Sequence, residues 1–319
     1  MLSRVADSLY WMSRYLERAE HTVRILDVNM GLMLDRSNTS AERRWKRVLV
    51  ALGSPENAPW GGDYNALVST LTYDPQCGGS ITSCIASARE NARQVRDEIS
   101  SEQWQHLNGI YHRITRRSSR DVLESTQEFM LAVMDGVHLL QGTTDSTMSH
   151  NDGWHFIQLG RYIERATATA SLLLIYHQEI LSLEEDVSDG QQYLEWIGLL
   201  RSCTAFEAYC QAYTAELTQD RILEFLLLNQ KFPHSLLYSV DSLCEALAAI
   251  QLATGRSSVE ELNRVAGRLR SSLTFAEISE ILHQDTTAYL ENILLQCRQI
   301  HDLIYRFYIH YSVESALSM

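Results

Sequence analysis

Two short stretches of the chain place glutamate and arginine in a pattern that could bind an anion or form buried ion pairs. The first is Ser13–Glu20 (SRYLERAE) and the second is Gly160–Thr167 (GRYIERAT). Aligned at their Glu-Arg pairs, both carry Arg, Tyr, Glu, Arg and Ala at equivalent positions. The planar guanidinium of arginine suits bidentate pairing with a carboxylate or a phosphate, and a glutamate can orient it or act as a general acid or base. These stretches are therefore the leading candidates for binding or chemistry.

The Glu-Arg pairs have two interpretations. Neighbouring residues on a helix point about 100° apart, so Glu17 and Arg18 should reach adjacent helices, in a crosswise arrangement with Glu164 and Arg165. In the first interpretation these residues form a structural charge network that holds two halves of the chain in register, and losing one partner would strongly destabilise the fold. In the second, the arginines line a pocket for a carboxylate or an acyl-phosphate, with Glu17 or Glu164 as acid or base.

Further polar residues extend this candidate site. Trp11 lies close to Arg14 and Arg18 on one side of the first helix, and a merely solvated face would seldom carry a tryptophan between arginines. Arg89, Arg93 and Arg96 share another helix face, which indicates an anion site or, more simply, a solvated face. The candidate residues for binding or for a structural network are Asp7, Trp11, Arg14, Glu17, Arg18, His21, Arg89, Glu90, Arg93, Trp154, Arg161, Glu164, Arg165 and Arg201.

Metal and cofactor chemistry have little support in the sequence. A helical di-iron site needs two Glu-x-x-His motifs, and only Glu280-Ile281-Leu282-His283 fits that pattern. Zinc-ligand spacings, a His-Glu-x-x-His motif, a Gly-rich phosphate loop and a Gly-x-Ser-x-Gly elbow are all missing. The sequence therefore predicts no metal and no cofactor, and it assigns no catalytic residue.

Composition limits the classes of partner. The 319 residues carry a formal net charge of −13, which argues against nucleic acid and anionic membrane surfaces as partners. No stretch approaches about 20 apolar residues, so no membrane-spanning helix is expected, and Met1–Asp7 lacks the apolar run of a signal peptide. The six cysteines form no C-x-x-C pair and are expected to be reduced, as in a cytoplasmic protein.

Long helices must position the candidate residues. Only 4 prolines and 15 glycines occur in the chain, which favours long helices over turn-rich β structure. Apolar residues from Leu2 to Met33 recur at spacings of three and four, which predicts a helix from Ser3 to about Asp35. A second helix of this kind starts at Asn151-Asp152 and carries the second Glu-Arg pair on the equivalent face.

No strand is predicted, so the expected fold class is all-α: a multi-helix bundle with two pseudo-repeated long Glu-Arg helices. We expect a single domain over residues 1–319, composed of two pseudo-repeat halves at about 1–147 and 148–319.

Local signals predict further helix boundaries. Asp63, Ser80 and Ser101 are predicted N-caps, and the helix that Ser80 begins should run to about Ile99. Pro233 is expected to be the first residue of a helix that ends before Gly255. Ser257 or Ser258 should cap the next helix, and a last long helix should run from about Asp285 to Tyr311.

These residues together resemble the alpha-E domain family, all-helical proteins named for the Glu-Arg motif. The resemblance covers nearly the whole chain and is carried by Met1–Glu20, Ala88–Arg93, Gly160–Ala166, Leu200–Cys203 and Glu224–Leu228. Ser13 stands where the family usually has glycine, and His21 stands where it usually has asparagine.

The resemblance implies a bacterial cytoplasmic protein encoded beside a circularly permuted ATP-grasp ligase and a transglutaminase-like peptidase. The main hypothesis is therefore a helical accessory subunit that binds the ligase or presents its peptide or amino-acid substrate. One alternative is an enzyme in its own right, with an Arg/Glu pocket that acts on a carboxylate or acyl-phosphate. A second alternative is a structural homo-oligomer.

Overall fold

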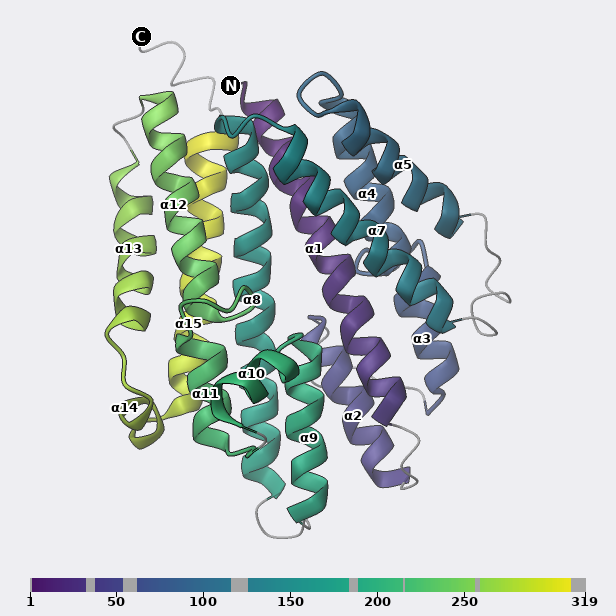
Figure 1. Ribbon diagram of the computed structural model, residues 1–319, viewed down its shortest axis with the longest axis vertical. Coiled ribbons are helices and arrows are strands. Elements are labelled where there is room, and N and C mark those ends of the chain that lie inside the picture. The colour runs from purple at the N-terminus through teal and green to yellow at the C-terminus, as the bar shows by residue number, and fades with distance from the viewer. Residues whose placement is uncertain are drawn as a thin grey trace.

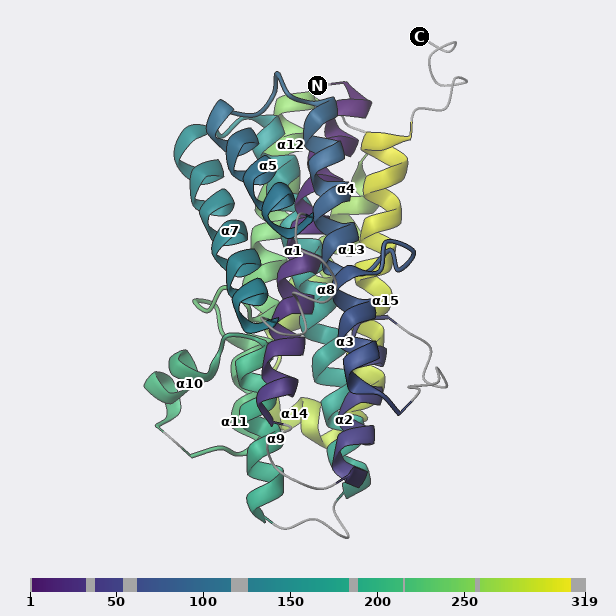
Figure 2. The same cartoon turned by 90° about the vertical axis from the view of Figure 1, so that its right-hand side faces the viewer.

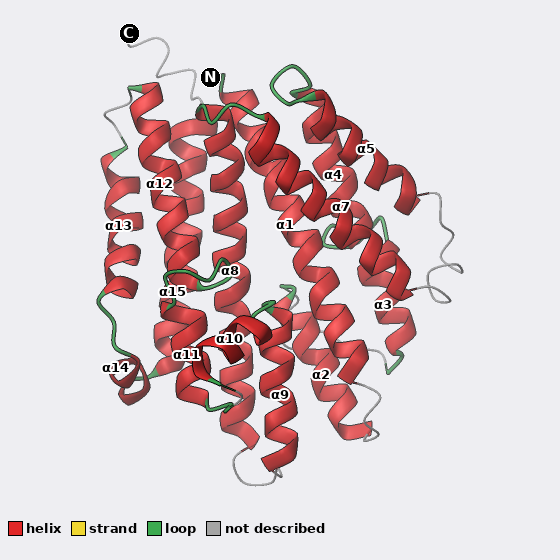
Figure 3. Cartoon of the chain, viewed as in Figure 1, coloured by secondary structure: helices red, strands yellow, loops and turns green. Residues whose placement is uncertain are grey.

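The computed structural model describes residues 2–32, 38–53, 62–115, 126–183, 189–214, 216–255 and 259–310, without the side chains at 38–41, 180–183, 189 and 191. All regular structure in these ranges is helical, which confirms the all-α prediction (Figure 3). The helices are α1 (Ser3–Leu32), α2 (Asn38–Ala51), α3 (Tyr64–Tyr73), α4 (Ile81–Gln94), α5 (Ser101–Thr115), α7 (Thr126–Thr147), α8 (Asp152–Leu183), α9 (Asp189–Ser202), α10 (Phe206–Tyr213), α11 (Gln219–Leu228), α12 (Leu236–Thr254), α13 (Glu260–Thr274), α14 (Ile278–His283), α15 (Thr286–Ile304) and the π-helix η1 (Tyr305–Ile309).

Helices α1 and α8 lie next to each other in the middle of the bundle (Figure 1). Helices α4 and α7 pack against α1, with α5 outside them, while α12 and α15 pack against α8, with α13 outside them. The long helices run roughly along the long axis of the molecule, as a view turned by 90° shows (Figure 2). The two Glu-Arg helices therefore touch, as the sequence predicts. A repeat relationship between the two halves of the chain stays a prediction.

Helix α1 is buried on more than one side. Its apolar seam, including Leu9, Leu16, Val23 and Leu26, is fully or almost fully inside the core. The other side of the helix also contacts protein, because Tyr10 is completely buried. The helix starts at Ser3, as predicted, and its described part ends at Leu32; residues 33–35 of the predicted helix lie outside the described residues.

The crossing of α1 and α8 depends on two small residues at equivalent positions of the two Glu-Arg stretches. A Cβ atom added to Gly160 would lie 2.3 Å from the backbone oxygen of Tyr10, so any larger residue would push the helices apart. Opposite it, the hydroxyl of Ser13 donates a hydrogen bond of 2.6 Å to the backbone oxygen of Ile157. Small residues at the crossing thus bring the flanking Glu-Arg residues of the two helices within reach of each other.

Two of the predicted N-caps are confirmed and two boundaries are corrected. The side chains of Asp63 and Ser80 accept hydrogen bonds from the first turns of α3 and α4. The cap of α5 is Ser100 and not Ser101, because Ser100 and Gln103 exchange side-chain to backbone hydrogen bonds in a reciprocal capping box. Helix α12 is capped by Ser235, so Pro233 precedes the helix and does not begin it.

Other predicted ends differ in length. Helix α4 ends at Gln94, before the predicted Ile99, because the buried Val95 leaves the helical conformation. Gly255 ends α12 in the left-handed conformation, with φ of 64°, as its residue type favours. Ser257 and Ser258 lie outside the described residues. The last predicted helix is α15, which changes to the π-helix η1 at Tyr305.

Helix α12 is the most apolar long helix found in the described part of the chain. By length and composition alone it could cross a membrane, although Asp241 and Glu245 interrupt its apolar residues. Its buried side, including Leu236, Leu243, Leu247 and Ile250, packs within the bundle, chiefly against α8 and α13. A position between two helices of the core accounts for its apolar residues.

Candidate functional site

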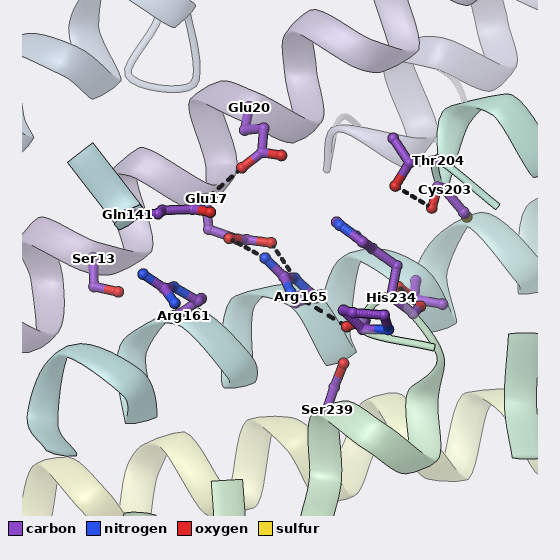
Figure 4. Close-up of polar contacts among 12 residues, drawn as sticks. Ser13, Glu17, Glu20, Gln141, Arg161, Arg165, Cys203, Thr204, His234 and Ser239 are labelled. Atoms are coloured by element: carbon purple, nitrogen blue, oxygen red, sulfur yellow. Dashed lines mark hydrogen bonds and ion pairs between the residues drawn. The ribbon is translucent and has the colours of Figure 1, made fainter. Parts of the chain in front are cut away.

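The ion pair between Glu17 on α1 and Arg165 on α8 lies at the centre of the polar core (Figure 4). Arg165 donates from Nε and Nη2 to the two carboxylate oxygens of Glu17, at 2.5 and 3.0 Å, in a bidentate contact. Its remaining nitrogen, Nη1, donates to the backbone oxygen of Pro233 at 3.2 Å, in the loop between α11 and α12. Burial raises the pKa of Glu17 above its ordinary value, although the Arg165 guanidinium acts in the opposite direction.

The reciprocal pair joins Glu164 on α8 to α1. Arg18 donates from Nε to Oε1 of Glu164 at 2.6 Å, and Arg14 donates from Nε to Oε2 at 2.7 Å. Burial alone would raise the pKa of Glu164, but the two guanidinium groups hold that pKa below its ordinary value. The crosswise pairing predicted from the sequence is therefore confirmed: each glutamate binds the arginine of the opposite stretch.

A third buried glutamate, Glu20, extends the polar core toward α7. Arg24 pairs with it one helical turn along α1, and His138 and Gln141 reach it from α7 at 3.2 and 3.0 Å. Burial opposes ionisation of Glu20, yet His138 and Arg24 together hold the pKa of its carboxyl well below the ordinary value. A carboxylate with this many donors stays charged inside the protein.

A small polar cavity lies beside these ion pairs. The volume within which the centre of a water molecule can move is about 10 Å³, so the cavity has room for about one water molecule. His21 Nε2 and Ser202 Oγ are buried there without a hydrogen-bond partner among the described residues. Burial lowers the pKa of His21 to about 4, so the ring is neutral at pH 7. The cavity is lined by Glu17, Glu20, His21, Arg24, Arg165, Ala168, Thr169, Leu172, Ser202, Cys203 and His234.

Arg161 breaks the symmetry of the network. Arg161 is the residue of the second stretch that corresponds to Arg14 in the first. Since Arg14 pairs with Glu164, an equivalent contact would pair Arg161 with Glu17. Instead its Nη1 donates to Oε1 of Gln158 at 3.2 Å and lies 3.9 Å from the half-exposed carboxylate of Asp145 (Figure 4 shows its position near Ser13). A second cavity, with about 20 Å³ for the centre of a water molecule, lies between Arg161 and Glu17.

Aromatic side chains surround Arg14. The guanidinium carbon of Arg14 is 4.6 Å from the ring centroid of Trp11 and 5.5 Å from that of Tyr10. Its Nη1 also lies 3.0 Å from Nδ1 of His301 on α15, a nitrogen that is 2.8 Å from the hydroxyl of Tyr10. Burial, followed by the charge of Arg14, lowers the pKa of His301 to about 4, so His301 adds no positive charge at pH 7.

The structure places the other predicted residues outside this core. Arg89 packs on α5, with its guanidinium 4.5 Å from the Tyr111 ring centroid, whereas Arg93 pairs with Glu90 on the surface. Burial raises the pKa of Asp7, whose Oδ1 has no partner among the described residues. The remaining two residues contact nearby side chains: Trp154 donates to Asp145, and Arg201 lies over the ring of Phe206.

One buried ion-pair cluster was missed by the sequence analysis. Arg44 and Arg47 of α2 reach Glu195 on α9 at 2.9 and 2.6 Å, and Arg47 also reaches Glu179 on α8 at 2.7 Å. The Arg47 guanidinium lies 4.0 Å from the ring centroid of Tyr176. The only available signal was the pair of arginines on either side of the apolar Trp45, which is completely buried.

The geometry limits the chemistry of the polar core. Its buried carboxylates and guanidinium groups bind mainly one another, and the two cavities between them hold about one water each. A peptide or nucleotide does not fit there without movement of the helices. In the described part of the chain, no group of three or more His, Cys, Asp or Glu side chains is placed to hold a metal ion. Burial raises the pKa of the Cys203 thiol to about 12, which leaves it unreactive at pH 7.

Comparison with known proteins gives a family match over most of the chain. Residues 1–309 match a family described as a predicted alpha-helical domain with a conserved ER motif. The chain is 27% identical to an uncharacterised protein of Mycobacterium bovis and 26% identical to one of Mycobacterium tuberculosis, each over 316 residues. Each alignment covers 91% of this chain but 35% of the relative, so the chain spans about a third of the length of these relatives. No solved structure matches.

Proposed function

The chain belongs to the Alpha-E family, and from this membership and its closed polar core we propose that it is a helical accessory subunit of a peptide-forming or peptide-modifying system. The proposed partner is a circularly permuted ATP-grasp ligase, with a transglutaminase-like peptidase as the second member of the system. The subunit binds the ligase or presents its peptide or amino-acid substrate, in the cytoplasm of a bacterium.

One observation carries this proposal. The carboxylates of Glu17 and Glu164 are paired inside the bundle with arginines of the opposite helix, and the space between them admits only about one water molecule at each of two places. A binding subunit needs no internal substrate cavity, since it contacts its partner through its outer surface. The lengths of the relatives also support it, because the matched segment is joined there to about twice as much additional sequence.

The test is association with the ligase encoded beside this protein. We expect the two purified chains to elute together in size-exclusion chromatography, and the subunit to raise ligase turnover with a peptide substrate. An unrelated helical protein of similar net charge is the control. Separate elution together with unchanged ligase turnover would remove the proposal. The same column also tests the homo-oligomer alternative, which a concentration-independent monomer would exclude.

An enzyme is the second candidate function, favoured by the raised pKa of Glu17 beside a water-sized cavity. In that case the purified chain alone turns over a carboxylate or acyl-phosphate substrate. Glu17→Gln would then abolish turnover while the protein stays folded. Loss of the fold together with the activity would not support a catalytic role, because Glu17 is also the partner of Arg165.

A further inference from the structure

The central network holds more positive than negative charge. Within these ion pairs, three buried glutamates and the half-exposed Asp145 face five arginines, an excess of one positive charge when all are ionised; outside the pairs, the charge of Asp302 also acts on Tyr10 and His301, the neighbours of Arg14. The arginines are Arg14, Arg18, Arg24, Arg161 and Arg165, and the glutamates are Glu17, Glu20 and Glu164.

Arg18 is where this excess reaches the surface. Its side chain is 33% exposed, compared with 11% for Arg14, 8% for Arg24 and 7% for Arg165. Within the described residues it donates only through Nε, to Glu164. Its two terminal nitrogens therefore keep free N–H groups, which lie side by side in the plane of the guanidinium.

Aromatic rings adjoin this free edge. The guanidinium carbon of Arg18 lies 5.8 Å from the ring centroid of Tyr15, and the Tyr15 and Trp11 centroids are 5.4 Å apart. Both rings are half-buried, so each presents part of its surface to solvent. Glu164 already neutralises one of the two guanidinium groups bound to it, which leaves one net charge for a ligand.

We propose that Arg18, Tyr15 and Trp11 form a binding site for a carboxylate carried next to an apolar group, as at the C-terminus of a peptide or in a free amino acid. The two terminal N–H groups match the two oxygens of a carboxylate, and one excess charge matches a monoanion better than a dianionic phosphate. The rings of Tyr15 and Trp11 receive the apolar side chain.

This site deepens the proposed function, because it names the substrate class that the subunit would present. It is measured on the isolated chain, without the ligase. If the isolated chain does not bind a carboxylate, the proposed association with the ligase is unaffected. If the chain does not associate with the ligase, the proposed carboxylate site is unaffected.

The experiment is calorimetric titration of the chain with N-acetyl-alanyl-phenylalanine, with its C-terminal amide and with inorganic phosphate. We expect the free acid to bind, and the amide and phosphate to bind at least about tenfold more weakly, since the amide carries no negative charge and phosphate carries no apolar group for the two rings. Arg18→Gln, and also Arg18→Lys, should weaken binding of the free acid about tenfold, because lysine keeps the charge but loses the fork.

Arg93→Gln is the matched control, since Arg93 is also an arginine paired with a glutamate, but on an ordinary surface helix. It should bind the free acid like the unaltered chain. Melting temperatures of all variants establish that they are folded. Trp11→Leu should weaken binding of the phenylalanine peptide more than binding of acetate. The proposal is overturned if the free acid and its amide bind equally, if folded Arg18 variants bind normally, or if phosphate binds better than the peptide.

Discussion

Glu17 and Glu164 occupy equivalent positions of the two stretches but differ in their proton affinity. Glu164 receives two guanidinium groups, which hold its pKa below the ordinary value, whereas Glu17 receives only Arg165 directly, and burial raises its pKa. The difference follows from Arg161, which turns to Gln158 and Asp145 where Arg14 binds glutamate. Identical letters in two stretches therefore do not give identical chemistry.

Removal of the Arg165 side chain tests the structural weight of the central pair. Arg165→Met would leave the fully buried Glu17 without its bidentate partner and should lower the free energy of unfolding by about 3–5 kcal/mol. Chemical denaturation measures this change, and Arg93→Gln should stay within about 0.5 kcal/mol of the unaltered chain. Adding Glu17→Gln to Arg165→Met should restore much of the loss. An additive double variant would show that the pair is not coupled.

His21 gives the stability a defined pH dependence. Its pKa is lowered to about 4 in the folded state. As the pH falls from 6.5 toward 4, His21 is therefore protonated in the unfolded chain but stays neutral in the folded chain. Stability from this group is present above pH 6.5 and is lost over that window, at up to about 1.4 kcal/mol per pH unit. The charged groups that influence its ring are Glu164, Arg24 and Glu20.

His21→Asn should reduce this slope, because asparagine does not titrate. Denaturation curves at several pH values between 6.5 and 4 give the difference between the two slopes. His283→Asn is the control, since His283 is exposed at the end of α14. Equal slopes for the unaltered chain and His21→Asn would contradict the assignment.

At the scale of the elements, the α1–α8 crossing is the most constrained contact. Gly160→Ala would place a Cβ atom 2.3 Å from the backbone oxygen of Tyr10, and backbone cannot move aside as a flexible side chain can. We expect a loss of about 1–3 kcal/mol in the free energy of unfolding, or more, from overpacking. Gly267→Ala on α13 meets nothing within 4 Å and should stabilise the chain by up to about 1 kcal/mol. If the two substitutions changed the free energy of unfolding equally, the close approach of α1 and α8 at Gly160 would not be the cause of the change.

Much of this element level could be predicted from the sequence, because its signals are local. Capping residues such as Asp63 and Ser80, and the three-and-four spacing in α1, act within one helix and need no knowledge of the fold. Ser100 was missed because either of two neighbouring serines could cap, and only the position of Gln103 decides between them.

The candidate site was harder to predict. The repeated letters predicted the crosswise pairs of Glu17 and Glu164, but tertiary contacts decide the rest. The cluster of Arg44 and Arg47 with Glu195 joins residues about 150 positions apart that share no motif. The departure of Arg161 depends on Asp145 in the preceding helix, which one sequence cannot reveal.

At the scale of the whole molecule, two buried charge clusters fasten different parts of the bundle. The central cluster joins α1, α7, α8, α15 and the loop before α12, whereas the second joins α2 to α8 and α9. Helix α8 runs through both, with Glu164 in one cluster and Glu179 in the other. Each cluster can therefore be weakened separately.

Glu195→Gln should loosen only the second cluster. It removes the charge that faces Arg44 and Arg47, while Arg47 keeps Glu179. Hydrogen exchange should become faster in α2 and α9, with α12 and α13 unchanged. Asp241→Asn, which breaks a surface ion pair with Arg270, is the matched control and should leave α2 unchanged. Uniform acceleration along the chain would mean that the two clusters are not separable.

The closeness of α1 and α8 has a consequence for biosynthesis. Ser13 and Ile157, which are hydrogen-bonded at the crossing, are 144 positions apart in the chain. At about 5–20 residues per second, a ribosome needs about 7–30 s to deliver the second after the first. Throughout that time the side of α1 that packs against α8 is uncovered, and Glu17 lacks its partner Arg165. The nascent N-terminal half therefore exposes part of the apolar surface of α1, with only α4 and α7 to cover the rest. We expect it to need protection from aggregation until α8 has been synthesised.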